Sequence, residues 1–243
     1  MSLNSKNILI STIVRNREPF LKNWISQLND ICKFRPEINF YLSVYENDSI
    51  DGSKEILQSL DYSNFKQFKI ITEDLDTPFF GSVQNSLRVK LLAEARNKSL
   101  FENEFLEKCD WVLSIEPDVK YNVEDVLRII DNDDYDILSG RSMEITSTSN
   151  PTYLYDVWAT RNTSSHSHWS SNVEFNKIIE TWSTYNCFCK YNAEPIKNKI
   201  AFDYHNKRLG RDDCDTAVIC ENFRENGYSK IALDGTVNIF HMR

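Results

Sequence analysis

Two carboxylates that stand one residue apart are the clearest candidates for chemistry in this sequence. Glu116 and Asp118 flank Pro117 and directly follow the apolar run 111–115, which is typical of a buried strand. In proteins, Mg²⁺ and Mn²⁺ bind to carboxylates together with substrate phosphates, and the ion neutralises negative charge on a departing diphosphate. The pair therefore predicts a site for Mn²⁺ or Mg²⁺, and an acidic turn that caps the next helix is the structural alternative.

Similar polar side chains follow the other predicted strands of the N-terminal half. Ligands of open α/β sheets bind beyond the carboxyl ends of the strands, so we expect these residues to surround one cleft. Carboxylates that share a cleft repel one another unless a cation binds there or some of them take up protons. The residues concerned are Arg15, Asn16, Arg17, Glu46, Asp48, Asp51, Glu73, Asp74 and Asp76.

Two arginines of a predicted helix add positive charge near this cleft. Arg88 and Arg96 are eight residues apart, so both can face one side of the helix, and Asn97 follows directly. Arginines that face the cleft would bind phosphate oxygens or the acidic cluster. An ordinary solvated helix face is the alternative.

Three residues late in the chain are further candidates. Asp212 and Asp213 stand at the predicted start of a helix, where aspartate is common as a structural cap. Their functional alternative is contact with the hydroxyl of an acceptor. His241 follows the last predicted strand and is either a third metal ligand or a structural residue.

Several aromatic residues have two interpretations. Trp158, Trp169 and Trp182 either belong to the core or stack on sugar rings. His166 and His168 lie in a serine-rich loop, and we interpret them as structural.

The composition limits the class of protein. The 243 residues include 28 basic and 36 acidic side chains, and the net charge of −8 argues against nucleic-acid binding, which needs a basic face. Six scattered cysteines without a CxxC pair indicate free thiols in a reducing compartment. The N-terminus lacks signal-peptide features and no apolar run reaches the roughly 18 residues of a membrane span, so we expect a soluble, cytoplasmic chain.

The N-terminal half alternates strands and helices, which predicts a mainly parallel central sheet flanked by helices. The predicted strands cover 8–14, 38–45, 68–72, 111–115 and 136–139.

The C-terminal half is less regular. We expect loops over 142–172 with a strand at 155–158. Further along the chain, the pattern predicts a helix over 172–182, a helix from Asp212 or Asp213 to about Glu225, and strands at 229–233 and 237–240. Gly227 is typical of a helix stop.

These motifs resemble those of the GT-A fold glycosyltransferases. The segment 45–53 is similar to their acidic turn after the second strand, and Ala95-Arg96-Asn97 with the strand ending at Asp118 is similar to their helix and DxD strand. Within that fold the chain most resembles the fungal capsule-associated α-1,3-mannosyltransferases, also known as the cryptococcal mannosyltransferase family. Arg88 and the late segments 186–187 and 192–195 contribute to this resemblance, which extends over about 8–241.

The resemblance implies a single GT-A (Rossmann-like) domain over 1–243. Its half up to about residue 140 would bind the nucleotide-sugar and the rest would bind the acceptor. Glu116 and Asp118 would take the DxD role, and Asp212 or Asp213 would match the acceptor-side acid. His241 remains our own candidate for a third metal ligand. Glu46 would contact the nucleotide base or ribose, and Arg15 and Arg17 would line the nucleotide pocket. Our further candidates for contact with the nucleotide-sugar are Thr12, Asp48, Arg88, Arg96, Asn97 and Glu116.

The predicted function is metal-dependent transfer of a hexose to a glycan acceptor, with mannose from GDP-mannose and retained configuration as first choice. An inverting transferase that uses a UDP-sugar and an inactive glycan-binding module are the alternatives. A nucleotidyltransferase is disfavoured because it usually needs a glycine-rich phosphate loop near the first strand, and the segment 11–18 contains no glycine.

Overall fold

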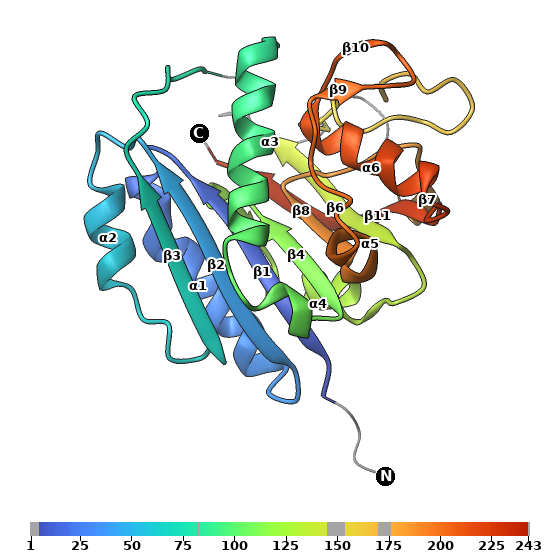
Figure 1. Cartoon of the computed structure of the whole chain (residues 1–243). Helices are drawn as coiled ribbons and strands as arrows, with labels where there is room; N and C mark the ends of the chain where they lie inside the picture. The colour runs from blue at the N-terminus through green and yellow to red at the C-terminus, as the bar shows by residue number, and fades with distance from the viewer. Residues whose placement is uncertain (1–4, 82, 145–153, 170–175, 243) are drawn as a thin grey trace.

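The computed structural model describes residues 5–81, 83–144, 154–169 and 176–242, and most of its strands belong to one large sheet (Figure 1). The strand order is β3-β2-β1-β4-β8-β6-β11-β5, and β7 pairs with β11.

One half of this sheet is parallel, as the sequence predicts. β1 pairs in parallel with β2 and with β4, and β2 pairs in parallel with β3. Because β1 is buried on both faces, nearly all of its residues are apolar or small. The carboxyl ends of these strands therefore meet along one edge. Their bounds are β1 (Asn7–Val14), β2 (Asn39–Asn47), β3 (Gln67–Glu73) and β4 (Trp111–Ile115).

The other half is mixed. β8 runs antiparallel to both β4 and β6, whereas β6 and β11 are parallel with a register shift between Leu233 and Asn238. β5 and β7 each pair antiparallel with β11. The bounds are β5 (Val119–Tyr121), β6 (Ile137–Glu144), β7 (Ile178–Glu180), β8 (Phe188–Asn192) and β11 (Ile231–His241).

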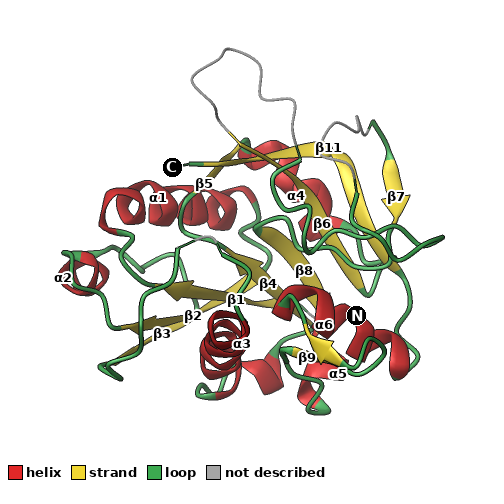
Figure 2. Ribbon diagram, turned by 90° about the horizontal axis from the view of Figure 1, so that it is seen from above, coloured by secondary structure: helices red, strands yellow, loops and turns green. Residues whose placement is uncertain are grey.

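Helices cover both faces of the sheet (Figure 2). The helices α1 (Glu18–Phe34), α2 (Ser53–Ser59) and α4 (Val123–Asp131) pack on one face, where Trp24 and Leu57 lie in the core. The helices α3 (Ser86–Phe101), α5 (Ala193–Lys197) and α6 (Asp215–Glu225) pack on the other. The short elements are the 3-10 helix η1 (Leu106–Lys108) and the ribbon of β9 (His205–Asn206) and β10 (Arg211–Asp212).

The structure corrects several predictions for the C-terminal half. The strand predicted at 155–158 is a turn, and pairing is limited to a bridge between Leu154 and Met143. The helix predicted over 172–182 is wrong for the described residues from 176 onward, which contain β7; residues 172–175 lie outside the described residues. The two late strands are the single β11, because a register shift lets one strand continue through Gly235.

The fold class is confirmed as an α/β protein with a mainly parallel sheet between helices. The six cysteines are buried free thiols, as expected. Within the described residues, no helix combines the length and the apolar character that crossing a bilayer requires.

Candidate active site

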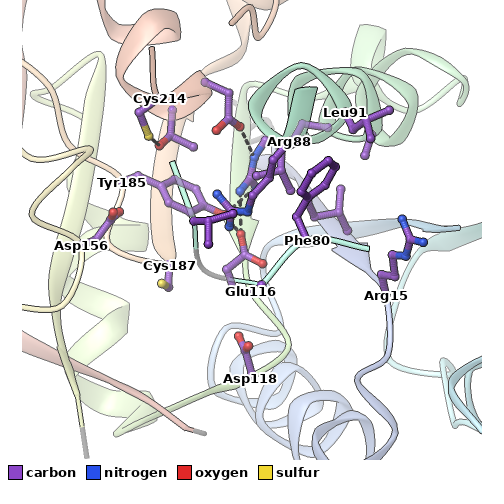
Figure 3. Close-up of a pocket in the computed structure, with 18 of the residues that line it drawn as sticks. Arg15, Phe80, Arg88, Leu91, Glu116, Asp118, Asp156, Tyr185, Cys187 and Cys214 are labelled. Carbon is purple, nitrogen blue, oxygen red and sulfur yellow. Dashed lines mark hydrogen bonds and ion pairs between the residues drawn. The ribbon is translucent and has the colours of Figure 1, made fainter. Parts of the chain in front are cut away.

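A cavity of about 600 Å³ opens at the carboxyl ends of β1 and β4 (Figure 3). We call its first side the Arg15 wall, which comprises residues 13–15, Arg17, Asn47, 78–81 and 83–84. We call the facing side the Asp156 wall, which comprises residues 155–158, Tyr185, Cys187 and 214–216. Between them, Glu116, Asp118, His241 and the α3 residues Arg88 and Arg96 are part of the lining.

Asp118 is buried at the base of the cavity with two basic neighbours. Its Oδ2 lies 2.9 Å from Nε of Arg17 and 3.4 Å from Nε2 of His241. Burial alone would raise the pKa of this carboxyl, but the His241 hydrogen bond and the Arg17 charge outweigh burial and lower the pKa. Asp118 is therefore an anion that faces the cavity.

His241 is held beside Asp118 by an aromatic contact. The Tyr155 ring stacks on the imidazole with centroids 3.9 Å apart. The Nδ1 atom of His241 is buried and has no hydrogen-bond partner among the described residues. The β11–β5 pairing of His241 with Val119 explains the juxtaposition, because it places the end of the chain's last strand next to Asp118.

Glu116 points in a different direction from Asp118. Its Oε1 accepts hydrogen bonds from Nη2 of Arg96 at 2.7 Å and from the hydroxyl of Tyr185 at 2.6 Å. Nε of Arg96 also pairs with Oδ2 of Asp215 at 2.9 Å. Burial disfavours the Arg96 charge, but Tyr185 and the two carboxylates keep the pKa of the guanidinium well above its usual value. Arg96 therefore links α3, β4 and the start of α6.

These placements set the limits of a metal site. Among the described residues, no group of three or more acidic, histidine or cysteine side chains is arranged to hold an ion. Asp118 and His241 lie together, while Oε1 of Glu116 accepts from Arg96 and Tyr185. Two of the three predicted metal ligands thus lie side by side, and the third, Glu116, points toward Arg96.

Arg15 and Asp48 are anchors for the loop between β3 and α3. Nη2 of Arg15 donates to the Thr77 carbonyl at 2.6 Å, and the guanidinium lies 5.5 Å from the centroid of the Phe79 ring. Oδ1 of Asp48 accepts backbone hydrogen bonds from Leu75 and Asp76, at 2.6 and 3.0 Å. Both residues were predicted to bind the nucleotide-sugar. In the structure both hold the loop that forms part of the Arg15 wall, and of the two only Arg15 lines the cavity.

Three other residues that were predicted to bind the nucleotide-sugar lie outside the cavity lining. Thr12 donates to the Ile115 carbonyl and joins β1 to β4. Glu46 is fully buried and accepts from the Ser49 amide, which closes the turn after β2. Asn97 exchanges two hydrogen bonds with the backbone of Phe202. Each side chain supports the residues around the site.

The structure corrects the placement of Asp212 and Asp213. The helix begins at Asp215, two residues later than the later of the two predicted starts. Asp213 is buried and forms two hydrogen bonds with Arg161, at 2.6 and 2.7 Å, while Asp212 belongs to β10 beside His205. Neither lines the cavity: the Asp213 carboxylate is paired with Arg161, although the next residue, Cys214, belongs to the lining.

Sequence reasoning missed Asp156, Tyr185 and Asp215 in the cavity lining. Asp215 stands two residues after the predicted pair, so a shifted helix start would have identified it. Asp156 and Tyr185 had no signal, since neither ends a predicted strand nor stands in a recognisable motif. Burial raises the pKa of Asp156 to about 6, although amide hydrogen bonds and Arg96 partly oppose this.

The aromatic candidates differ in whether they line the cavity. Trp158 lines the cavity, whereas Trp169 and Trp182 do not. His166 stacks on Trp182 with ring centroids 3.8 Å apart, and neither His166 nor His168 lines the cavity.

A family model described as Cryptococcal mannosyltransferase 1 matches residues 7–220. The chain belongs to this mannosyltransferase family. The match includes most of the cavity lining but not His241. The expectation of a glycosyltransferase is thereby confirmed at the level of the family. A search of curated proteins found no match.

Solved structures show the same fold. The TM-score is 0.61 for GalNAc-T7 with UDP, GalNAc and Mn²⁺, at 9% identity over 100% of this chain and 45% of that one. The TM-score is 0.58 for the mannosyltransferase PcManGT of Pyrobaculum calidifontis with GDP-Man and Mn²⁺. The two share 12% identity, and the match covers 99% of this chain and 57% of PcManGT. For S. aureus TarS 1–349 the TM-score is 0.55, at 16% identity, and the match covers 98% of this chain and 60% of TarS 1–349. The chain thus spans about half of the length of these glycosyltransferases, and at such identity the likeness shows the GT-A fold alone.

Proposed function

We propose that this chain transfers a hexose from a nucleoside-diphosphate sugar to a glycan hydroxyl. The observation that carries the proposal is the cavity in which Asp118 and His241 lie between arginines at the carboxyl ends of β1 and β4. That arrangement suits a diphosphate with a divalent cation, and the family assignment points to mannose. GDP-mannose is the first candidate donor, because one similar structure is a mannosyltransferase with GDP-Man and Mn²⁺.

Asp118 and His241 fit the binding of Mn²⁺ or Mg²⁺. Their nearest atoms are 3.4 Å apart, and neighbouring ligands of an octahedral ion with bonds of about 2.1 Å are separated by roughly 3 Å. Waters and donor phosphates would complete the coordination, as is usual for these ions. When bound, the cation would neutralise charge on the diphosphate leaving group.

Arginines of the chain would stabilise the same charge. Arg17 lies next to Asp118, and Arg88 lines the cavity from α3 without an ion pair to any described residue. Both are therefore placed to donate to phosphate oxygens as negative charge develops. Arg96 has a different role, since its guanidinium is occupied by Glu116, Asp215 and Tyr185.

Retention of configuration is the stereochemical outcome that we propose. An inverting transferase needs a free base beside the acceptor hydroxyl. Asp212 and Asp213 lie outside the cavity lining, and Asp215 is paired with Arg96. The placement of these three acids supports retention, whereas an inverted product would point to Asp156, a fourth acid of the cavity lining, as the base. The anomeric coupling constant of the product, measured by NMR, distinguishes the two outcomes.

The donor is tested by thermal stabilisation. Ligands that bind only the folded state raise the melting temperature with concentration. We expect GDP-mannose with Mn²⁺ to stabilise the protein more than UDP-glucose with Mn²⁺ or either nucleotide-sugar with EDTA. Equal shifts for all nucleotide-sugars would contradict the choice of donor, and the absence of any shift or hydrolysis would contradict the transferase proposal.

A further inference from the structure

We propose that the Asp156 wall is a binding site for an uncharged sugar, in which the Asp156 carboxylate accepts a hydrogen bond from a hydroxyl of the acceptor and Trp158 covers the ring. The inference rests on the proposed function and adds the acceptor class and the residues that select it.

The two walls differ in charge. The Arg15 wall carries two arginines, whereas the segments 155–158 and 214–216 contain no lysine, arginine or histidine. The Asp156 wall instead presents two carboxyl groups, Asp156 and Asp215. Asp215 is paired with Arg96, so Asp156 is the carboxylate of this wall that is left to face a ligand. A carboxylate in that position favours a neutral ligand whose hydroxyl groups donate over an anionic one.

Trp158 supplies an apolar surface beside these acids. It is half-buried, packs against the core cluster around Ala217 and Phe223, and lines the cavity. An aromatic ring with one exposed side can cover the C–H face of a sugar while neighbouring acids bind its hydroxyls. Neither Trp169 nor Trp182 lines the cavity, so Trp158 is the tryptophan placed for this contact.

The Asp156 carboxylate is held rigidly from behind. Its Oδ2 accepts the backbone amide of Asn186 at 3.0 Å, and its own amide donates to Oγ of Ser142 at 3.2 Å. Figure 3 shows Asp156 beside Tyr185 and Cys187, across the cavity from Arg15.

Asn186 is the residue that sets this geometry. Its fully buried amide accepts from Oγ of Ser142 at 2.8 Å and donates to the hydroxyls of Thr184 at 2.9 Å and Thr160 at 3.1 Å. Asn186 and Cys187 both have positive φ values, 55° and 60°, which are unfavourable for residues with a side chain and persist only where surroundings enforce them. Asn186 is thus a positioning residue for Asp156.

The test measures acceptor binding without turnover. NMR titration of the whole chain with a mannose disaccharide, and with the matching disaccharide that carries a uronic acid, is done in the presence of GDP and Mn²⁺. We expect the wild-type protein to bind the neutral sugar at least tenfold more tightly. Asp156→Asn should weaken neutral-sugar binding at least fivefold and reduce this preference, whereas Asp134→Asn, at an exposed site away from the cavity, should change neither.

A second measurement separates the acceptor site from the donor site. For Asp156→Asn, the KM for the acceptor in transfer should rise by a larger factor than the KM for donor hydrolysis, whereas Asp134→Asn should change neither. Asn186→Ala should raise the acceptor KM in a way that is not additive with Asp156→Asn, since both changes disturb one carboxylate. A purely structural Asn186 would instead reduce donor hydrolysis and transfer alike.

Two outcomes would overturn the assignment. One is equal binding of neutral and anionic sugars by the wild-type protein, and the other is unchanged neutral-sugar binding in both Asp156→Asn and Trp158→Ala. Because the titration needs no reaction, its result stands even if donor hydrolysis is absent, which would contradict the proposed function instead.

Discussion

The Arg15 wall is held to the rest of the protein by contacts near the surface. The Asp156 wall and its neighbours are held by buried hydrogen bonds and ion pairs between segments that are distant in sequence. Arg15 keeps 21% of its side chain exposed and bonds to a loop, while Arg96 keeps 8% and connects Glu116, Tyr185 and Asp215. Bonds at exposed sites compete with water, and buried charges without partners are strongly unfavourable. We therefore expect the contacts of the first wall to contribute less to stability than the buried contacts around the second.

The largest expected effect tests this difference in stability. Arg96→Met leaves the carboxylates of Glu116 and Asp215 without their cation, so the free energy of unfolding should fall by about 3 to 5 kcal/mol. The matched change Arg15→Met should lower it by less than about 1 kcal/mol, because the site is partly exposed. Urea denaturation of both variants measures the contrast, and equal losses would show that the two walls do not differ in this way.

The second effect concerns the acid between the walls. Asp118→Asn removes the anion that Arg17 and His241 face. We expect kcat for Mn²⁺-dependent donor hydrolysis to fall at least 100-fold, about 2.7 kcal/mol of transition-state stabilisation. Circular dichroism checks that the variant is folded, and the Asp134→Asn variant serves as the matched control. Wild-type hydrolysis in Asp118→Asn would contradict the role of this carboxylate.

The third effect is the contribution of Asp156 to the pH dependence of the free energy of unfolding. The raised pKa of Asp156, about 6 against an ordinary 3.8, means that the folded chain binds more protons than the unfolded chain between these values. Ionisation of Asp156 therefore lowers the free energy of unfolding as pH rises from about 4 to about 6. Asp156→Asn removes this pH-dependent decrease. Relative to wild type, the variant should gain about 1 to 2 kcal/mol between pH 4 and pH 7, measured by urea unfolding. A constant difference across this range would indicate an ordinary pKa.

The smallest effect concerns a residue that lies on neither wall. Asp212 belongs to the β10 ribbon and does not line the cavity, so Asp212→Asn should leave donor hydrolysis and transfer within twofold of wild type. A loss of more than tenfold in transfer would restore this carboxylate as an acceptor contact and would require the β9–β10 ribbon to reach the cavity.

Local patterns determined the parallel half of the fold and the acids that end its strands. Apolar runs such as 8–14 and 111–115 predicted β1 and β4 because a strand buried on both faces leaves a continuous apolar signature. The position of Asp118 followed, since the end of a parallel strand fixes where the next residues emerge. The C-terminal half was predicted less well, because its turns and short strands are held by long-range bonds such as those from Asn186.

Which of the candidate residues face the cavity was decided by the tertiary structure alone. The sequence contained Glu116, Arg96 and Asp215, but their mutual ion pairs appear only when α3 and α6 pack on one face of the sheet. In the same way, Asp213 is bound by Arg161, and Asp156 reaches the cavity because the Asn186 turn places it there. Spacing along a chain specifies the ends of strands and the faces of helices, whereas the partner of a buried charge depends on which distant segment supplies the opposite charge.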